Sequence, residues 1–97
     1  MNCNSYEIFF RNFSNKTKLD IIMALRNKPL SVNELVKILG DEQSKVSHSL
    51  TSLASCGILS VKQEGKKRIY SLNKETIMPL IELVSKHVEK HCTGRCK

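Results

Sequence analysis

The sequence lacks any apolar run long enough to cross a membrane, and its first residues lack the charged-then-apolar order of a secretion signal. It also contains no nucleophile–base constellation, no glycine-rich phosphate loop and no metal-catalysis motif. Internal repeats and low-complexity tracts are absent as well. We therefore expect a cytoplasmic, non-enzymatic protein with no membrane partner, folded as a single domain over residues 1–97.

Acidic residues are scarce: 9 Asp and Glu stand against 16 Lys and Arg, which gives a net charge of +7. Such an excess attracts polyanions, and nucleic acid is the commonest polyanion inside a cell. Solubility alone is the other explanation of this charge. The segment from Gln43 to Tyr70 holds five Lys or Arg and one Glu, so the positive charge is concentrated in one part of the chain.

Aromatic residues are also few, and four of the five lie near the amino end, at Tyr6, Phe9, Phe10 and Phe13. This spacing predicts a helix with all four on one face. Such a face must be buried, either on the protein's own core or on a second copy.

Two helices are predicted next. The first is capped by Ser14 or Asn15, and the second begins with a capping box of Ser31 and Glu34 and ends at Gly40. The apolar stripe of the first of these helices is expected to have Leu19, Ile22, Met23 and Arg26 at its edges.

A further helix is predicted in "DEQSKVSHSLTSLASCG", where Val46, Leu50 and Leu53 form a narrow apolar stripe. Its opposite face carries short hydrogen-bonding side chains, which are mediocre helix formers on a surface. A function other than helix stability therefore explains them better. The next segment, "ILSVKQEGKKRIYSL", predicts two strands around a turn near Glu64–Gly65 with a basic tip, and "NKETIMPLIELVSKHVEKHC" predicts a last helix beginning near Pro79.

This order of elements predicts a mainly α fold with a small β-hairpin, the winged helix-turn-helix. In that fold the second helix of the pair lies in the DNA major groove and the hairpin tip contacts the phosphate backbone. The alternative is an ordinary exposed helix face and a solvated hairpin tip. The predicted DNA-binding residues are Gln43, Ser44, Lys45, Ser47, His48, Thr51, Lys66, Lys67 and Arg68.

The stretch "LSVNELVKILGDEQSKVSHSLTSLASCGILSVKQEGKKRIYSL" resembles the DNA-binding core of the ArsR/SmtB family of metal- and stress-sensing repressors, and the resemblance covers residues 14–73. Two positions depart from the family pattern: Ser49 replaces a His, and Glu42 replaces a Ser or Thr cap, with Asp41 as a substitute. The resemblance implies a homodimer that packs through residues 1–13 and 74–92, with 93–97 as a tail. Two-fold symmetry would match a pseudo-palindromic operator in double-stranded DNA.

The family also implies release of DNA by a ligand, although no cofactor is required. The segment "SVNELVKIL" contains no cysteine, so one known type of sensing site is absent. His87 and His91 match part of a second type, at the end of the last helix. Cys56, Cys92 and Cys96 match a third, in which thiolates suit a soft inducer such as Cd²⁺, Pb²⁺, Zn²⁺ or trivalent arsenic.

Other interpretations stay open. In a cytoplasmic chain cysteines are expected as free thiols, metal ligands or a redox pair before structural disulfides. Cys92 and Cys96 alone would make a dithiol switch, whereas Cys56 is equally explained as a small buried side chain. The histidines are explained as part of a helix interface. A winged-helix module that binds another protein, with no ligand, is a further alternative to the repressor.

Overall fold

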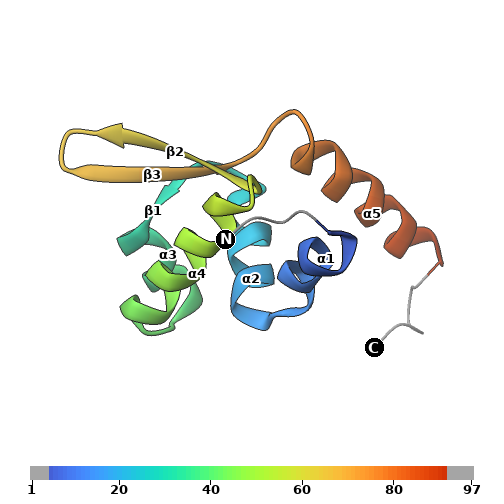
Figure 1. The fold of residues 1–97 in the computed structure, drawn as a ribbon, viewed down its shortest axis with the longest axis horizontal. Coiled ribbons are helices and arrows are strands. Elements are labelled where there is room, and N and C mark those ends of the chain that lie inside the picture. Colours follow the sequence, from blue (N-terminus) through green and yellow to red (C-terminus); the bar gives the residue numbers. More distant parts are fainter. Residues whose placement is uncertain (1–4, 92–97) are drawn as a thin grey trace.

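The computed structural model describes residues 5–91. Within them, five α-helices pack beside a small three-stranded antiparallel sheet whose hairpin projects to one side, in the arrangement of a winged helix-turn-helix (Figure 1). The fold class predicted from the sequence is therefore confirmed. The elements in chain order are α1 (Tyr6–Ser14), α2 (Lys16–Leu25), β1 (Leu30–Ser31), α3 (Val32–Leu39), α4 (Gln43–Ser55), β2 (Leu59–Glu64), β3 (Lys67–Leu72) and α5 (Ile77–His91).

Local capping interactions set most of the helix boundaries. The Asn15 side chain accepts the Lys18 N–H at the start of α2, which confirms one of the two predicted caps. Both hydrogen bonds of the predicted capping box are present at the start of α3. Gly40 ends α3 with a φ of +68°, a left-handed conformation that costs glycine little and other residues more.

The predicted hairpin is formed by β2 and β3, which pair from Leu59 opposite Leu72 to Glu64 opposite Lys67. A third strand, β1, was not predicted. It pairs antiparallel with β3, with Leu30 opposite Tyr70, and gives the sheet order β1-β3-β2. Because α3 follows β1 directly, this pairing holds the start of α3 close to the hairpin (Figure 1).

The hydrophobic core lies between α2, α3, α4 and the base of the hairpin. Each fully buried aliphatic side chain contributes roughly 1.5–3 kcal/mol relative to an exposed one, so these contacts hold the helix pair rigidly. Ile77 and Ile81 attach the first turns of α5 to this core, whereas Leu83, Val84 and Val88 further along are exposed. No helix among residues 5–91 combines the length and the apolar character needed to span a membrane.

Candidate DNA-binding surface

Helix α4 turns its polar face outward because Val46, Leu50 and Leu53 are completely buried on its other side. Of the six predicted DNA-binding residues on α4, only Ser47 is partly buried, and the others are exposed. The Thr51 hydroxyl donates to the Ser47 carbonyl oxygen at 3.1 Å, so its proton is already used within the helix.

The hairpin tip is basic and open. Lys66, Lys67 and Arg68 are exposed, and within residues 5–91 no carboxylate lies within ion-pair distance of them. The acidic residue of the tip, Glu64, lies 4.0 Å from Lys62 instead. Unpaired cations are available to an anionic partner such as a phosphate.

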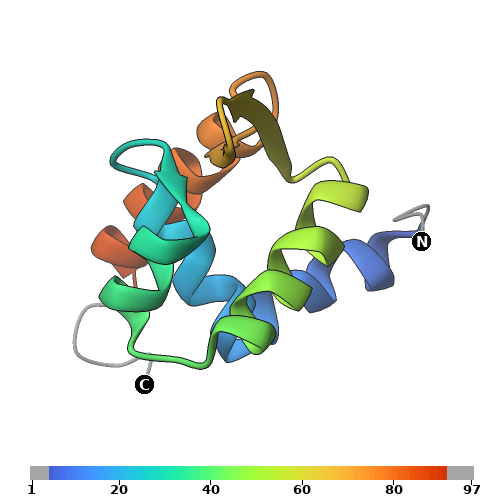
Figure 2. The ribbon, with the colours of Figure 1, turned by 90° about the vertical axis from the view of Figure 1, so that its left-hand side faces the viewer.

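The structure brings the start of α4 and the hairpin tip to one groove of about 390 Å³. Gln43 from α4 and all three basic tip residues line it, so predicted residues more than twenty positions apart meet there. Asn33 and Gln63 also line the groove and were not predicted. No local sequence pattern marks these two residues as part of the groove. They line it because β1 pairs with β3 and brings α3 to the hairpin, and that pairing joins residues far apart in the sequence. Figure 2 shows α3 and α4 joined by a short turn below the hairpin.

The capping box has an electrostatic consequence at the edge of this surface. The Ser31 N–H donates to a Glu34 carboxylate oxygen at 2.9 Å, and this bond, with the Ser31 hydroxyl, lowers the pKa of Glu34 below its ordinary value. The positive charges of Lys28 and Lys67 lower it further. Glu34 is therefore ionised at neutral pH and its charge lies close to the basic tip.

The predicted sensing residues are only partly covered by the structure. Cys56 is the C-cap of α4, is partly buried, and accepts a hydrogen bond from the Asn12 side-chain amide at 3.8 Å. Its sulfur is disulfide-bonded, which does not fit a free thiol or a thiolate ligand but fits the redox pair that the sequence left open, and the other cysteine of that bond lies outside the described residues. Cys92 and Cys96 also lie outside the described residues.

His87 and His91 lie on the last turns of α5 with exposed side chains and ring centroids 4.7 Å apart. Two imidazoles make half of a tetrahedral metal site. Among residues 5–91, no group of three or more His, Cys, Asp or Glu side chains is arranged to hold a metal ion. The histidine site therefore stays a prediction that lacks further ligands in the described part of the chain.

An apolar groove of about 630 Å³ runs between α1, α2 and α5. The rings of Phe9, Phe10 and Phe13 contact one another on α1, with centroids 5.1–6.4 Å apart, and two of them line this groove. The three Phe residues of the predicted aromatic face therefore lie together and are only partly buried, whereas Tyr6 is 87% exposed and does not line the groove. The lining residues are Phe10, Phe13, Leu19, Met23, Leu80, Ile81, Val84, Ser85, Val88 and Glu89.

Comparison with known proteins agrees with this geometry. A family model described as "Bacterial regulatory protein, arsR family" matches residues 15–61, the segment from α2 into β2. The transcriptional regulator NmtR of Mycobacterium tuberculosis is 36% identical over 75% of this chain and 61% of its own length. A probable mercury resistance operon repressor of Streptomyces lividans is 31% identical over 77% of this chain and 60% of its own length. The chain thus spans about 60% of the length of these two relatives.

Solved structures extend the likeness beyond the matched segment. The solution structure of apo-NmtR superposes with a TM-score of 0.72 and 32% identity, covering 84% of this chain and 69% of that one. The homodimeric winged helix-turn-helix domain Mb0332 of Mycobacterium bovis gives a TM-score of 0.79 over 90% of this chain and 81% of that one, and at 22% identity supports the fold alone. On the sequence and structural similarity together, the chain belongs to the ArsR family of bacterial regulatory proteins.

Proposed function

We propose that the protein is a dimeric, sequence-specific DNA-binding transcriptional repressor. The observation that carries this proposal is the groove shared by the start of α4 and the basic hairpin tip, since it gives one continuous surface for DNA. Exposed short polar side chains on α4 suit base edges in the major groove, and the cations of the tip suit phosphates. Residues Gln43, Ser44, Lys45, Ser47, His48, Thr51, Lys66, Lys67 and Arg68 are proposed as the contacts.

The partner proposed for the apolar groove is a second copy of the chain. Phe10 and Val84 on its walls are both about half exposed, and large exposed apolar patches commonly mark interfaces. A symmetric dimer would place two copies of α4 on successive half-sites of a pseudo-palindromic operator. The Mb0332 domain of Mycobacterium bovis, which has the same fold, is described as homodimeric.

The proposed signal is a soft metal or metalloid ion bound by thiolates of Cys56, Cys92 and Cys96. Cys56 caps the carboxyl end of α4, so a ligand bound there would act directly on the proposed recognition helix. One relative is named a probable mercury resistance operon repressor, which links a protein of this kind to a soft metal. Because a disulfide sulfur is not a thiolate, metal binding by Cys56 requires the reduced protein. His87 and His91 are a second, weaker candidate.

The disulfide at Cys56 favours a second candidate, a repressor that responds to oxidation. Two thiols lose two electrons and two protons to an oxidant such as a peroxide when they form a disulfide. Because Cys56 is the C-cap residue of α4, forming or breaking that disulfide would change what the end of this helix is attached to, with no metal involved. Cys92 and Cys96 remain the other thiols proposed for this switch.

Fluorescence anisotropy on DNA from the protein's own promoter tests both candidates. The reduced protein is titrated with Cd²⁺, Pb²⁺, Zn²⁺ and arsenite and then with hydrogen peroxide, beside Cys56→Ser and a Cys92→Ser/Cys96→Ser double variant. Release by an ion, lost in both variants, supports the metal sensor. Release by oxidant alone supports the redox switch. Tight binding that neither treatment disturbs contradicts both, and no DNA binding by the reduced protein contradicts the repressor.

A further inference from the structure

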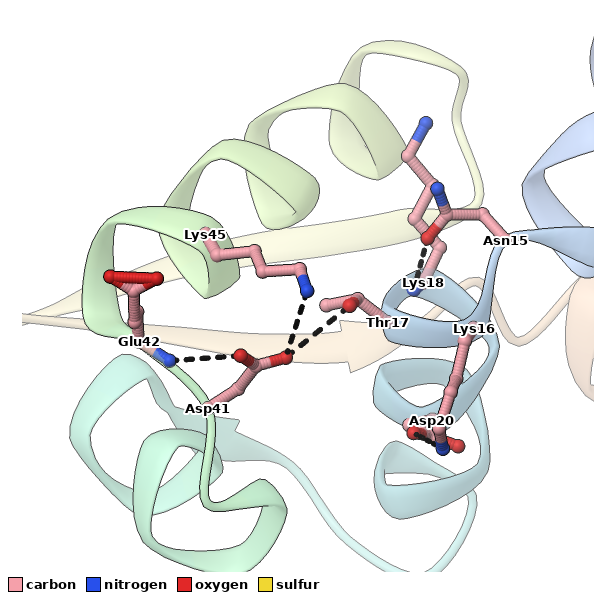
Figure 3. Close-up of polar contacts among 8 residues, drawn as sticks. All are labelled: Asn15, Lys16, Thr17, Lys18, Asp20, Asp41, Glu42 and Lys45. Atoms are coloured by element: carbon pink, nitrogen blue, oxygen red, sulfur yellow. Dashed lines mark hydrogen bonds and ion pairs between the residues drawn. The ribbon is translucent and has the colours of Figure 1, made fainter.

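The turn between α3 and α4 contains a carboxylate with three partners, shown in Figure 3. One oxygen of Asp41 accepts the Thr17 hydroxyl at 3.3 Å and lies 3.7 Å from the Lys45 ammonium group. The other oxygen accepts the backbone N–H of Glu42 at 3.0 Å. A single side chain thus connects α2, the turn and the first turn of α4.

Thr17 is a fixed point for this connection. It lies in the first turn of α2, where Asn15 caps the helix, and only 7% of its surface is exposed. Ile21 and Ile22 of the same helix are fully buried in the core. The packing of α2 therefore fixes the position of Thr17. A hydrogen bond from Thr17 to Asp41 restricts where the turn between α3 and α4 can lie.

The start of α4 needs such a connection because its own cap is weak. Glu42 is the N-cap residue, and its side chain makes no capping hydrogen bond. The ion pair of Asp41 with Lys45 adds little, since the two side chains are 30% and 57% exposed and such pairs are screened by solvent. Of the contacts of Asp41, the bond to the Thr17 hydroxyl is the one that joins the turn to the buried start of α2.

We propose that Asp41 is a positioning residue for DNA recognition. Its hydrogen bonds with the Thr17 hydroxyl and the Glu42 N–H fix the position of the first turn of α4 relative to α2. Its ion pair with Lys45 holds that side chain against the same turn. Base contacts depend on the placement of the helix to within a fraction of an ångström, whereas contacts to phosphates tolerate displacement. Asp41 therefore acts on sequence discrimination through its contacts, whereas its charge changes the affinity for every duplex alike. This inference rests on the proposed binding of DNA by α4.

The test measures binding to two duplexes, one selected by the wild-type protein from a random pool and one scrambled duplex of equal length. Asp41→Ala is expected to lower the ratio of the two affinities about tenfold, the scale of one lost base contact. Asp41→Asn is expected to keep the ratio within about twofold, because its oxygen accepts the Glu42 N–H and its nitrogen donates to Thr17. Thermal unfolding of each variant confirms that it folds.

Glu42→Ala is the matched control, since it removes the same charge one residue away and leaves the contacts of Asp41 in place. The lost charge strengthens binding to both duplexes alike, so it cancels in the ratio. A wild-type ratio in Asp41→Ala, or an equal fall in Glu42→Ala, overturns the inference, and so does a failure of Asp41→Asn to restore the ratio. If the wild-type protein selects no duplex at all, the proposed function itself fails.

Discussion

The proposed DNA-binding surface and the proposed dimerisation groove differ in the chemistry that they offer a partner. The surface of α4 and the hairpin tip is polar and basic, and the cations of its tip have no ion-pair partner among residues 5–91. The groove between α1, α2 and α5 is apolar, with Ser85 and Glu89 as its polar lining residues. One surface should therefore bind with a strong dependence on salt, and the other with little. The next experiments separate the two surfaces, from the largest expected effect to the smallest.

The groove is tested by Val84→Glu, which places a carboxylate on a side chain that is 48% exposed and lines the groove. If a second copy covers the groove, a buried unpaired charge weakens dimerisation by about 100-fold or more. Sedimentation equilibrium measures the change. Ile38→Glu is the control, because Ile38 is 58% exposed on α3 and does not line the groove. Equal dimerisation of both variants would show that the groove is not the interface.

The polar face of α4 is tested by His48→Ala. We expect about a tenfold change in preference among closely related duplexes, because a base contact discriminates by roughly 1–3 kcal/mol. Thr51→Ala should have a smaller effect, since its hydroxyl proton already bonds to the Ser47 carbonyl. Competition binding with single-base variants of the selected duplex measures both. An unchanged preference in both proteins would contradict the proposed docking of α4.

The hairpin tip is tested by Lys67→Ala, which should weaken binding several-fold on every duplex without changing the order of preference. If Lys67 neutralises one phosphate, the slope of log K against log salt falls by about 0.9. Lys90→Ala removes the same charge from the last turn of α5, at the opposite end of the molecule (Figure 1), and should leave the slope nearly unchanged. Equal slopes for all three proteins would remove the tip from the interface.

The smallest effect concerns the capping box beside the tip. The folded-state pKa of Glu34 is lowered, so this carboxylate contributes stability that is present above the pKa of an unfolded glutamate, about 4.3, and is lost as the pH falls through the lower folded-state value. Glu34→Gln should therefore be less stable than the wild type at pH 7, and the difference should narrow on acidification. Thermal unfolding between pH 7 and pH 3 measures it. Ser31→Ala should retain part of the pH dependence, because the backbone N–H bond remains.

The apolar residues of α2 show where sequence reasoning reached its limit. The predicted stripe contained Leu19, Ile22 and Met23, but the structure buries Ile21, Ile22 and Leu25 in the core. Leu19 and Met23 line the apolar groove instead. The helix has apolar residues on two faces, and periodicity cannot decide which face meets the core. Packing against the neighbouring helices decides it.

The sequence by itself determined what neighbouring residues settle among themselves. Each of these features involves residues only a few positions apart. They are the cap at Asn15, the capping box of Ser31 and Glu34, the stripe of Val46, Leu50 and Leu53, and the hairpin near Gly65. The tertiary structure alone decided the β1–β3 pairing, the groove that joins Asn33 and Gln63 to the tip, and the contact of Asp41 with Thr17. These depend on residues far apart in the chain, whose meeting follows from the packing of the whole core and not from any local pattern.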